Sequence, residues 1–143
     1  MSQALKSSGP NWSLSDPDLL KTQAYINGEW VDADSGATFP VYNPATNEVI
    51  VEVANVGAAE TRRAIEAAEV ARHEWAARSA HERSAILRKW NDLMLDNVED
   101  LAIIMTQEQG KVLAESRGEI VYAASFIEWF AEEGKRIYGD LIP

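Results

Sequence analysis

The stretch that decides the fold of this chain is "VLAESRGEIVYAASFIEWFAEEGKRIYG", which runs from Val112 to Gly139. Apolar residues recur in it at spacings of three and four, the pattern of an amphipathic helix. Two glycines, Gly118 and Gly134, interrupt the pattern, and each costs a helix about 1 kcal/mol relative to alanine. We therefore predict one long helix in which each glycine either allows close packing or marks a break.

Aromatic residues are concentrated in the second half of this helix. Tyr122, Phe126 and Trp129 follow one another at spacings of four and three, so they share one helical face. Ile127 and Phe130 fall on a neighbouring face, where we expect them to anchor the core. An aromatic stripe at this spacing is typical of core packing and also of a ligand-facing wall. The spacing alone leaves both alternatives open.

Three further helices are predicted upstream of this stretch. Each shows the same three-and-four rhythm of apolar residues. The third ends at Gly110, which is suited to a left-handed C-cap. Their expected ranges are 57–76, 79–98 with a start at Ser79 or Ala80, and 99–110. Helices are thus expected over 57–138.

Residues 24–56 predict a small antiparallel β-region. Asn27-Gly28 lies between two apolar pairs and is the dipeptide that best accepts the positive φ angles of a tight hairpin. Residues 38–46 are expected to be extended because they contain two prolines. Residues 48–56 alternate valine with other residues and read as a further strand. The fold class expected for the chain is therefore mainly α-helix, preceded by short antiparallel strands.

Residues 1–23 are polar and contain Pro10 and Pro17, so we expect a disordered leader there, with the folded part over 24–143. The net charge of −10 argues against a nucleic-acid partner, because phosphate contacts need clustered Lys and Arg. Apolar runs stay well short of the ~20 residues of a membrane span. The N-terminus also lacks the pattern of a secretory signal, so a cytoplasmic location is expected.

Several strings in this chain resemble the aldehyde dehydrogenase family. "YINGEWVDADSGATFPVYNPATNEVI" (25–50) is similar to the opening of such an enzyme, and residues 105–143 resemble its succinate-semialdehyde dehydrogenase branch. The resemblance covers 24–143. It implies an α/β, aldehyde dehydrogenase-like fold of which this chain is an incomplete part. We therefore expect an N-terminal segment that stops before the catalytic half.

The resemblance also implies a chemistry, the oxidation of succinic semialdehyde to succinate with NAD or NADP in 4-aminobutyrate degradation. In this family a cysteine thiolate attacks the aldehyde and hydride passes to the nicotinamide. The chain contains no cysteine, so we expect no catalytic residue, no cofactor-binding residue and no activity in this segment alone. The complete enzyme is expected to be a dimer or tetramer. Arg117 and Arg136, candidates for a substrate carboxylate, stay unassigned.

Two sets of site residues carry over from the resemblance. Glu108 in "EQGK", with a backbone carbonyl near Tyr42 in "VYNP", matches a position that holds a monovalent cation in the family. The alternative is that Glu108 is charged surface beside a helix end. Tyr122, Phe126 and Trp129 match the helix that borders the aldehyde tunnel, so the resemblance favours a ligand-facing role for them.

Two functional hypotheses remain open at this point. The chain is either the front part of an oxidoreductase or a stand-alone, non-enzymatic helical module that binds a partner. Both hypotheses predict a large exposed apolar surface. They differ in whether the rest of an enzyme or a separate partner covers that surface.

Overall fold

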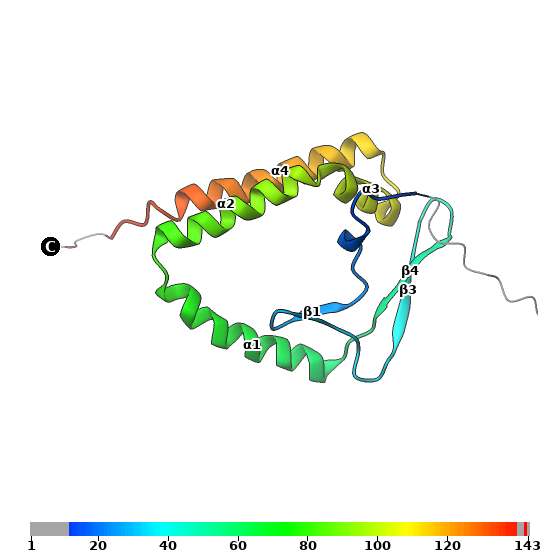
Figure 1. The fold of residues 1–143 in the computed structure, drawn as a ribbon, viewed down its shortest axis with the longest axis horizontal. Coiled ribbons are helices and arrows are strands. Elements are labelled where there is room, and N and C mark those ends of the chain that lie inside the picture. The colour runs from blue at the N-terminus through cyan, green and yellow to red at the C-terminus, as the bar shows by residue number, and fades with distance from the viewer. Residues whose placement is uncertain (1–11, 140–141, 143) are drawn as a thin grey trace, which may run out of the picture.

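The computed structural model describes residues 12–139 and residue 142. Within these residues it has four α-helices, as the sequence predicted, and the predicted small antiparallel β-region takes the form of two two-stranded sheets. Figure 1 shows helices α2 and α4 side by side, with β1 beside α1 and with β3 and β4 on the same side of the molecule as α3. The elements in chain order are η1 (Pro17–Leu19), β1 (Ala24–Ile26), β2 (Glu29–Val31), β3 (Thr38–Tyr42), β4 (Val49–Ala54), α1 (Ala58–Ala77), α2 (Ala80–Asp96), α3 (Val98–Gln109) and α4 (Leu113–Glu133).

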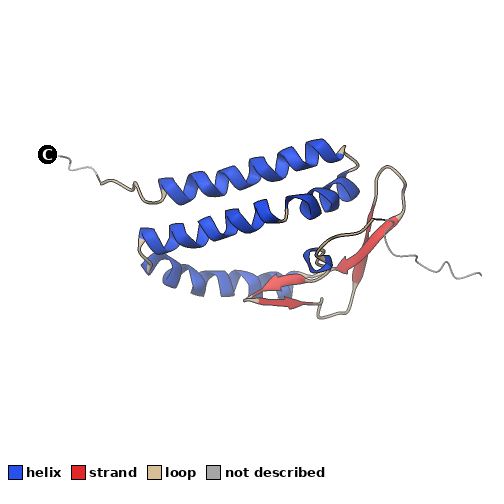
Figure 2. Ribbon diagram, turned by 45° about the horizontal axis from the view of Figure 1, so that its top comes forward, coloured by secondary structure: helices blue, strands red, loops and turns tan. Residues whose placement is uncertain are grey.

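The strands form two separate hairpins rather than one sheet. In the β1–β2 hairpin, Asn27 and Gly28 have φ angles of 52° and 86°, which confirms the predicted tight turn. Strands β3 and β4 pair from Thr38 opposite Ala54, with a register irregularity near Tyr42. Figure 2 shows both hairpins gathered at one end of the helices. The strands therefore leave most of α2 and α4 uncovered.

Helix α4 packs along α2 and α3 through small side chains. Ser116, Ala124 and Ala131 are at most 1% exposed, and Ile120 lies with them on the same face. The Asn91 side-chain amide on α2 donates a hydrogen bond of 2.9 Å to the Ala124 carbonyl. Most of these buried residues are short, so there is little room between the helices for a larger side chain at Ser116, Ala124 or Ala131.

The two glycines of α4 behave differently. Gly134 is the C-cap, and its amide donates to the Phe130 carbonyl at 2.9 Å. The helix ends at this glycine, which agrees with the predicted alternative of a break. Gly118 lies inside an unbroken helix, and a Cβ added to it would meet nothing within 4 Å. Neither a break nor close packing within the described residues explains Gly118, which corrects the expectation for that position.

Residues 12–23 also differ from the disordered leader that we expected. The buried Asp100 carboxylate, in the first turn of α3, accepts hydrogen bonds from the Ser15 and Asp16 amides at 3.0 and 2.8 Å. These bonds, that from Ser15 first, lower the pKa of Asp100. Asp16 in turn caps η1. Residues 1–11 lie outside the described residues.

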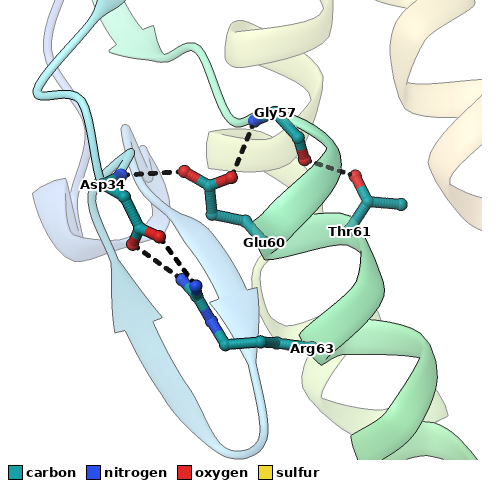
Figure 3. Close-up of polar contacts among 5 residues, drawn as sticks. All are labelled: Asp34, Gly57, Glu60, Thr61 and Arg63. Carbon is teal, nitrogen blue, oxygen red and sulfur yellow. Dashed lines mark hydrogen bonds and ion pairs between the residues drawn. The ribbon is translucent and has the colours of Figure 1, made fainter.

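A second buried carboxylate joins α1 to the chain after β2 (Figure 3). Glu60 is 4% exposed and accepts hydrogen bonds from the Asp34 amide at 2.8 Å and the Gly57 amide at 3.0 Å. The Asp34 bond is the main reason that the pKa of Glu60 is lowered. Arg63, one turn further along α1, pairs with both oxygens of the Asp34 carboxylate at 2.7 and 2.8 Å. The start of α1 is thereby fixed against the β1–β2 hairpin.

Helix α2 exposes much of the apolar stripe that its sequence shows. Leu87 and Met94 are partly buried, whereas Ile86, Trp90 and Leu93 are exposed on an adjoining face. The buried core is correspondingly small and built mainly of alanine. None of the helices in the described part of the chain is both long and apolar enough to cross a lipid bilayer.

We predict that Ala124→Leu lowers the free energy of unfolding of the chain by about 1–3 kcal/mol, because the larger side chain overfills the α2–α4 interface. Urea unfolding followed by circular dichroism measures the change. Ala123→Leu is the matched control, since Ala123 is exposed on the same helix, and it should shift the value by no more than about 0.5 kcal/mol. Equal effects of the two variants would contradict the packing described.

We predict that Glu60→Gln lowers the thermal midpoint at neutral pH, because a neutral amide replaces the charge that accepts two backbone hydrogen bonds. The folded-state pKa of Glu60 is lowered. Its stabilisation is therefore complete above the ordinary pKa of glutamate and disappears as pH falls through the folded value. The difference from the native chain should shrink over that acidic range. A difference independent of pH would be inconsistent with this role, and the exposed Glu66→Gln is the control.

Candidate functional site

The described residues form a surface groove along the second half of α4. Its volume is about 630 Å³. Tyr122, Phe126 and Trp129, the three aromatic residues singled out from the sequence, all line it. Its remaining lining residues are Ser125, Glu128, Phe130, Glu132, Glu133 and Arg136. The structure thus brings the predicted aromatic residues into one concave surface.

The aromatic wall of this groove is open to solvent. Tyr122 and Phe126 stack edge to face, with ring centroids 4.8 Å apart and an interplanar angle of 74°. Tyr122 is 65% exposed, Phe126 47% and Trp129 63%. Within the described part of the chain these rings are therefore surface and do not belong to the core.

The groove and the buried interface lie on opposite faces of α4. Residues advance by about 100° each in an α-helix. The buried Ser116, Ile120 and Ala124 cluster in one sector, and Tyr122 and Phe126 fall on the other side. One face of α4 therefore holds this segment together, while the aromatic face is left for another contact.

Charged residues surround the groove, and most of them are paired. Glu132 pairs with Lys135 at 2.8 Å and with Arg88 on α2, and these cations, Lys135 first, lower the pKa of Glu132 to about 2. Arg136 pairs with Glu133 at 3.2 Å. The rim is acidic overall, because it carries three glutamates and one arginine.

The two arginines that the sequence left unassigned are both engaged in ion pairs. Arg117 on α4 pairs with Glu99 on α3 at 2.7 Å and does not line the groove. Arg136 does line it, although its partner Glu133 lies beside it. Only Arg136 is thus placed near the aromatic wall.

Sequence reasoning missed part of the groove. Phe130 was expected to anchor the core, but it is 60% exposed and lines the groove, which corrects that expectation. Ile127 is only partly buried and is not among the buried hydrophobic residues of the core. The spacing of four between Phe126 and Phe130 was the available signal, since it places their side chains in adjacent turns.

The two positions expected at a cation site lie on segments that touch. The Asn43 side-chain amide donates to the Gln107 side chain at 2.8 Å, which joins the segments that carry Tyr42 and Glu108. At the end of α3, Gly110 has a φ of 71°, and an added Cβ would come within 2.8 Å of the Pro44 ring. Glu108 itself is exposed.

The described residues around Tyr42 and Glu108 do not form a cluster of side-chain metal ligands. The part of the chain that the structure describes has no group of three or more His, Cys, Asp or Glu side chains able to hold a metal ion. A monovalent cation with carbonyl ligands does not need such a group. The cation at Glu108 and Tyr42 therefore stays a prediction.

Comparison with known proteins gives the family. The model of the aldehyde dehydrogenase family matches residues 30–143. Glutarate-semialdehyde dehydrogenase of Pseudomonas putida is 65% identical over 130 residues, and succinate-semialdehyde dehydrogenase [NADP(+)] of Escherichia coli is 58% identical over 130 residues. Each alignment covers 91% of this chain and 27% of the relative.

Solved structures agree with this similarity. Succinate-semialdehyde dehydrogenase from Burkholderia pseudomallei superposes with a TM-score of 0.90 at 61% identity, over 92% of this chain and 27% of that one. This chain thus spans about 27% of the length of the relatives that it matches. Its hairpins and helices form a partial aldehyde dehydrogenase fold, and the chain belongs to the aldehyde dehydrogenase family.

Proposed function

We propose that this chain is the N-terminal part of an NAD(P)-dependent aldehyde dehydrogenase that oxidises succinic semialdehyde to succinate. The observation that carries the proposal is the identity of 58% over 130 residues to a succinate-semialdehyde dehydrogenase, together with the TM-score of 0.90 to another. The position of the aromatic groove on an otherwise unused helix face is consistent with a substrate-facing role. A dimer or tetramer is the proposed assembly of the complete enzyme.

Glutaric semialdehyde is a second candidate substrate. Two glutarate-semialdehyde dehydrogenases are 65% and 62% identical to this chain. The two aldehydes share a distal carboxylate and differ by one methylene group, which a hydrophobic site distinguishes by only about 1–3 kcal/mol. Both belong to one chemical class, the semialdehydes of short dicarboxylic acids.

The contribution that we assign to this segment is one wall of the aldehyde tunnel. Tyr122, Phe126 and Trp129 present a rigid apolar surface that can contact the carbon chain of the substrate and exclude water from it. Their exposure leaves room for the opposite wall of the tunnel, which the rest of the enzyme would supply. In this proposal the segment forms part of the tunnel wall and excludes water from the tunnel. It takes no part in proton transfer.

The nicotinamide cofactor does not fit the residues described. The sequence has no G-x-G-x-x-G turn to bind a pyrophosphate. Glu128, Glu132 and Glu133 along the groove would repel the phosphates of a dinucleotide. The cofactor, NAD or NADP, and the thiolate nucleophile are therefore assigned to the remainder of the enzyme.

A graft tests the proposal directly. The 130 matching residues of the E. coli relative are replaced by the corresponding residues of this chain, and NAD(P)H formation is followed with succinic and glutaric semialdehyde. We expect turnover by the grafted enzyme, because the segment supplies a compatible fold and tunnel wall. The isolated 143-residue chain should show none, because it has no thiol nucleophile.

The controls separate the two functional hypotheses. The native E. coli enzyme sets the reference rate, and the same enzyme without its matching segment sets the background. A stably folded grafted enzyme that lacks turnover with both aldehydes would refute the proposal. Turnover by the isolated chain would refute it as well, and a folded, inactive graft would favour the stand-alone binding module.

We predict that Phe126→Ala in the grafted enzyme lowers kcat/KM for succinic semialdehyde by about tenfold, through lost apolar contact with the substrate. Steady-state kinetics measure the change. Val121→Ala is the matched control, since Val121 is an exposed apolar residue of α4 that does not line the groove. Equal kcat/KM values for the two variants would contradict the proposal that Phe126 lines the tunnel.

A further inference from the structure

Gly118 is a glycine that the described structure does not need. It lies inside α4, and its φ is outside the left-handed region, so the backbone there would accept any residue. An added Cβ would meet nothing within 4 Å. Neither conformation nor packing of the described residues calls for glycine, although glycine weakens a helix interior relative to alanine.

The position of Gly118 indicates what the missing side chain makes room for. Gly118 is one helical turn before Tyr122, so the two lie on the same face of α4. The Tyr122 ring is in contact with Phe126, at 4.8 Å between centroids, and does not fold back over Gly118. The result is a patch of bare helix backbone that continues the aromatic wall toward the N-terminus of α4.

A ligand that follows the aromatic wall would meet this bare patch next. Side chains at Gly118 would project from the same face as the Tyr122 ring, into the space beside it. The neighbouring Glu119 is engaged by Lys111, so its carboxylate is paired and does not present a free negative charge there. The patch is thus open space over the helix backbone, with the Tyr122 ring one turn along the helix and the paired Glu119 next to it.

We propose that Gly118 is a specificity-determining residue, whose missing side chain leaves room for the carbon chain of the semialdehyde beside Tyr122. This inference rests on the proposed function. Gly118 was not among the residues predicted to line the tunnel, and its proposed role differs from that of the aromatic residues. The aromatic residues contact the substrate, whereas Gly118 limits how long and how wide the substrate can be.

The test uses Gly118→Ala and Gly118→Val in the grafted enzyme, with acetaldehyde, succinic semialdehyde and glutaric semialdehyde as substrates. We expect Gly118→Ala to lower kcat/KM about tenfold for succinic semialdehyde and more for the longer glutaric semialdehyde, with a change below about twofold for acetaldehyde. Gly118→Val should strengthen this dependence on length. The selectivity ratio between aldehydes is a readout that a purely structural role would not move.

Helix stability gives a second, independent readout. In the isolated chain Gly118→Ala should raise the thermal midpoint by about 3 °C, because alanine favours the helix and meets no neighbour. Ala123→Gly is the matched control, since Ala123 is exposed on the same helix and does not line the groove. It should lower the midpoint and leave the selectivity ratio unchanged.

The outcomes separate this inference from the proposed function. If the unmodified graft folds but oxidises neither semialdehyde, the proposed function fails and this inference fails with it. If the graft is active and Gly118→Ala changes kcat/KM equally for all three aldehydes, the glycine serves contact with protein and the inference alone is wrong. An unchanged kcat/KM for all three would also overturn it.

Discussion

The close approach of α4 to α2 and α3 is the contact on which the rest of this structure depends. The buried residues that α4 contributes to it are Ser116, Ile120, Ala124 and Ala131, with Ala124 and Ser116 fully enclosed. The Asn91 amide and the Thr106 hydroxyl satisfy the polar groups inside it, the latter by a 2.8 Å hydrogen bond to Ser116. Because this face of α4 is filled by small residues, the aromatic residues must lie on the other face.

Two buried carboxylates attach the segments outside this helical unit, which have few buried apolar residues of their own. Asp100 holds the segment before β1, and Glu60 holds the chain after β2, each by accepting backbone amide hydrogens at the start of a helix. A negative charge at a helix N-terminus is also favoured by the helix dipole. The hairpins and the N-terminal segment are thus attached by polar contacts, which leaves the large apolar side chains available for a different partner. In the proposed enzyme that partner is the remaining part of the polypeptide.

Local sequence signals predicted the elements well. The apolar spacing gave four helices, Asn27-Gly28 gave the first hairpin, and the left-handed Gly110 gave the end of α3. Those features depend on neighbours within a few residues, and propensity and steric arguments reach that far. The resemblance to aldehyde dehydrogenases, confirmed by the family match, gave the fold class.

Contacts between distant residues could not be predicted in the same way. Asp100 binds amides 84 and 85 positions away, and nothing in its local sequence marks it as an anchor for the N-terminal segment. Helical spacing puts Phe126 and Phe130 in adjacent turns on one side of α4, but it does not show whether that side is covered. Whether a side chain is buried depends on the element that packs against it. In α4 the face that packs against other helices is the one with the small residues at 116, 124 and 131.

The difference in solvent accessibility between the two faces of α4 can be measured with single introduced thiols, because the chain contains no cysteine. Ala124→Cys and Ala131→Cys place a thiol on the small-residue face, and Phe126→Cys places one on the aromatic face. We expect iodoacetamide to label Cys at 126 in the folded chain almost as fast as in urea, and to label Cys at 124 and 131 many times more slowly. Similar labelling rates on the two faces of the folded chain would contradict the account.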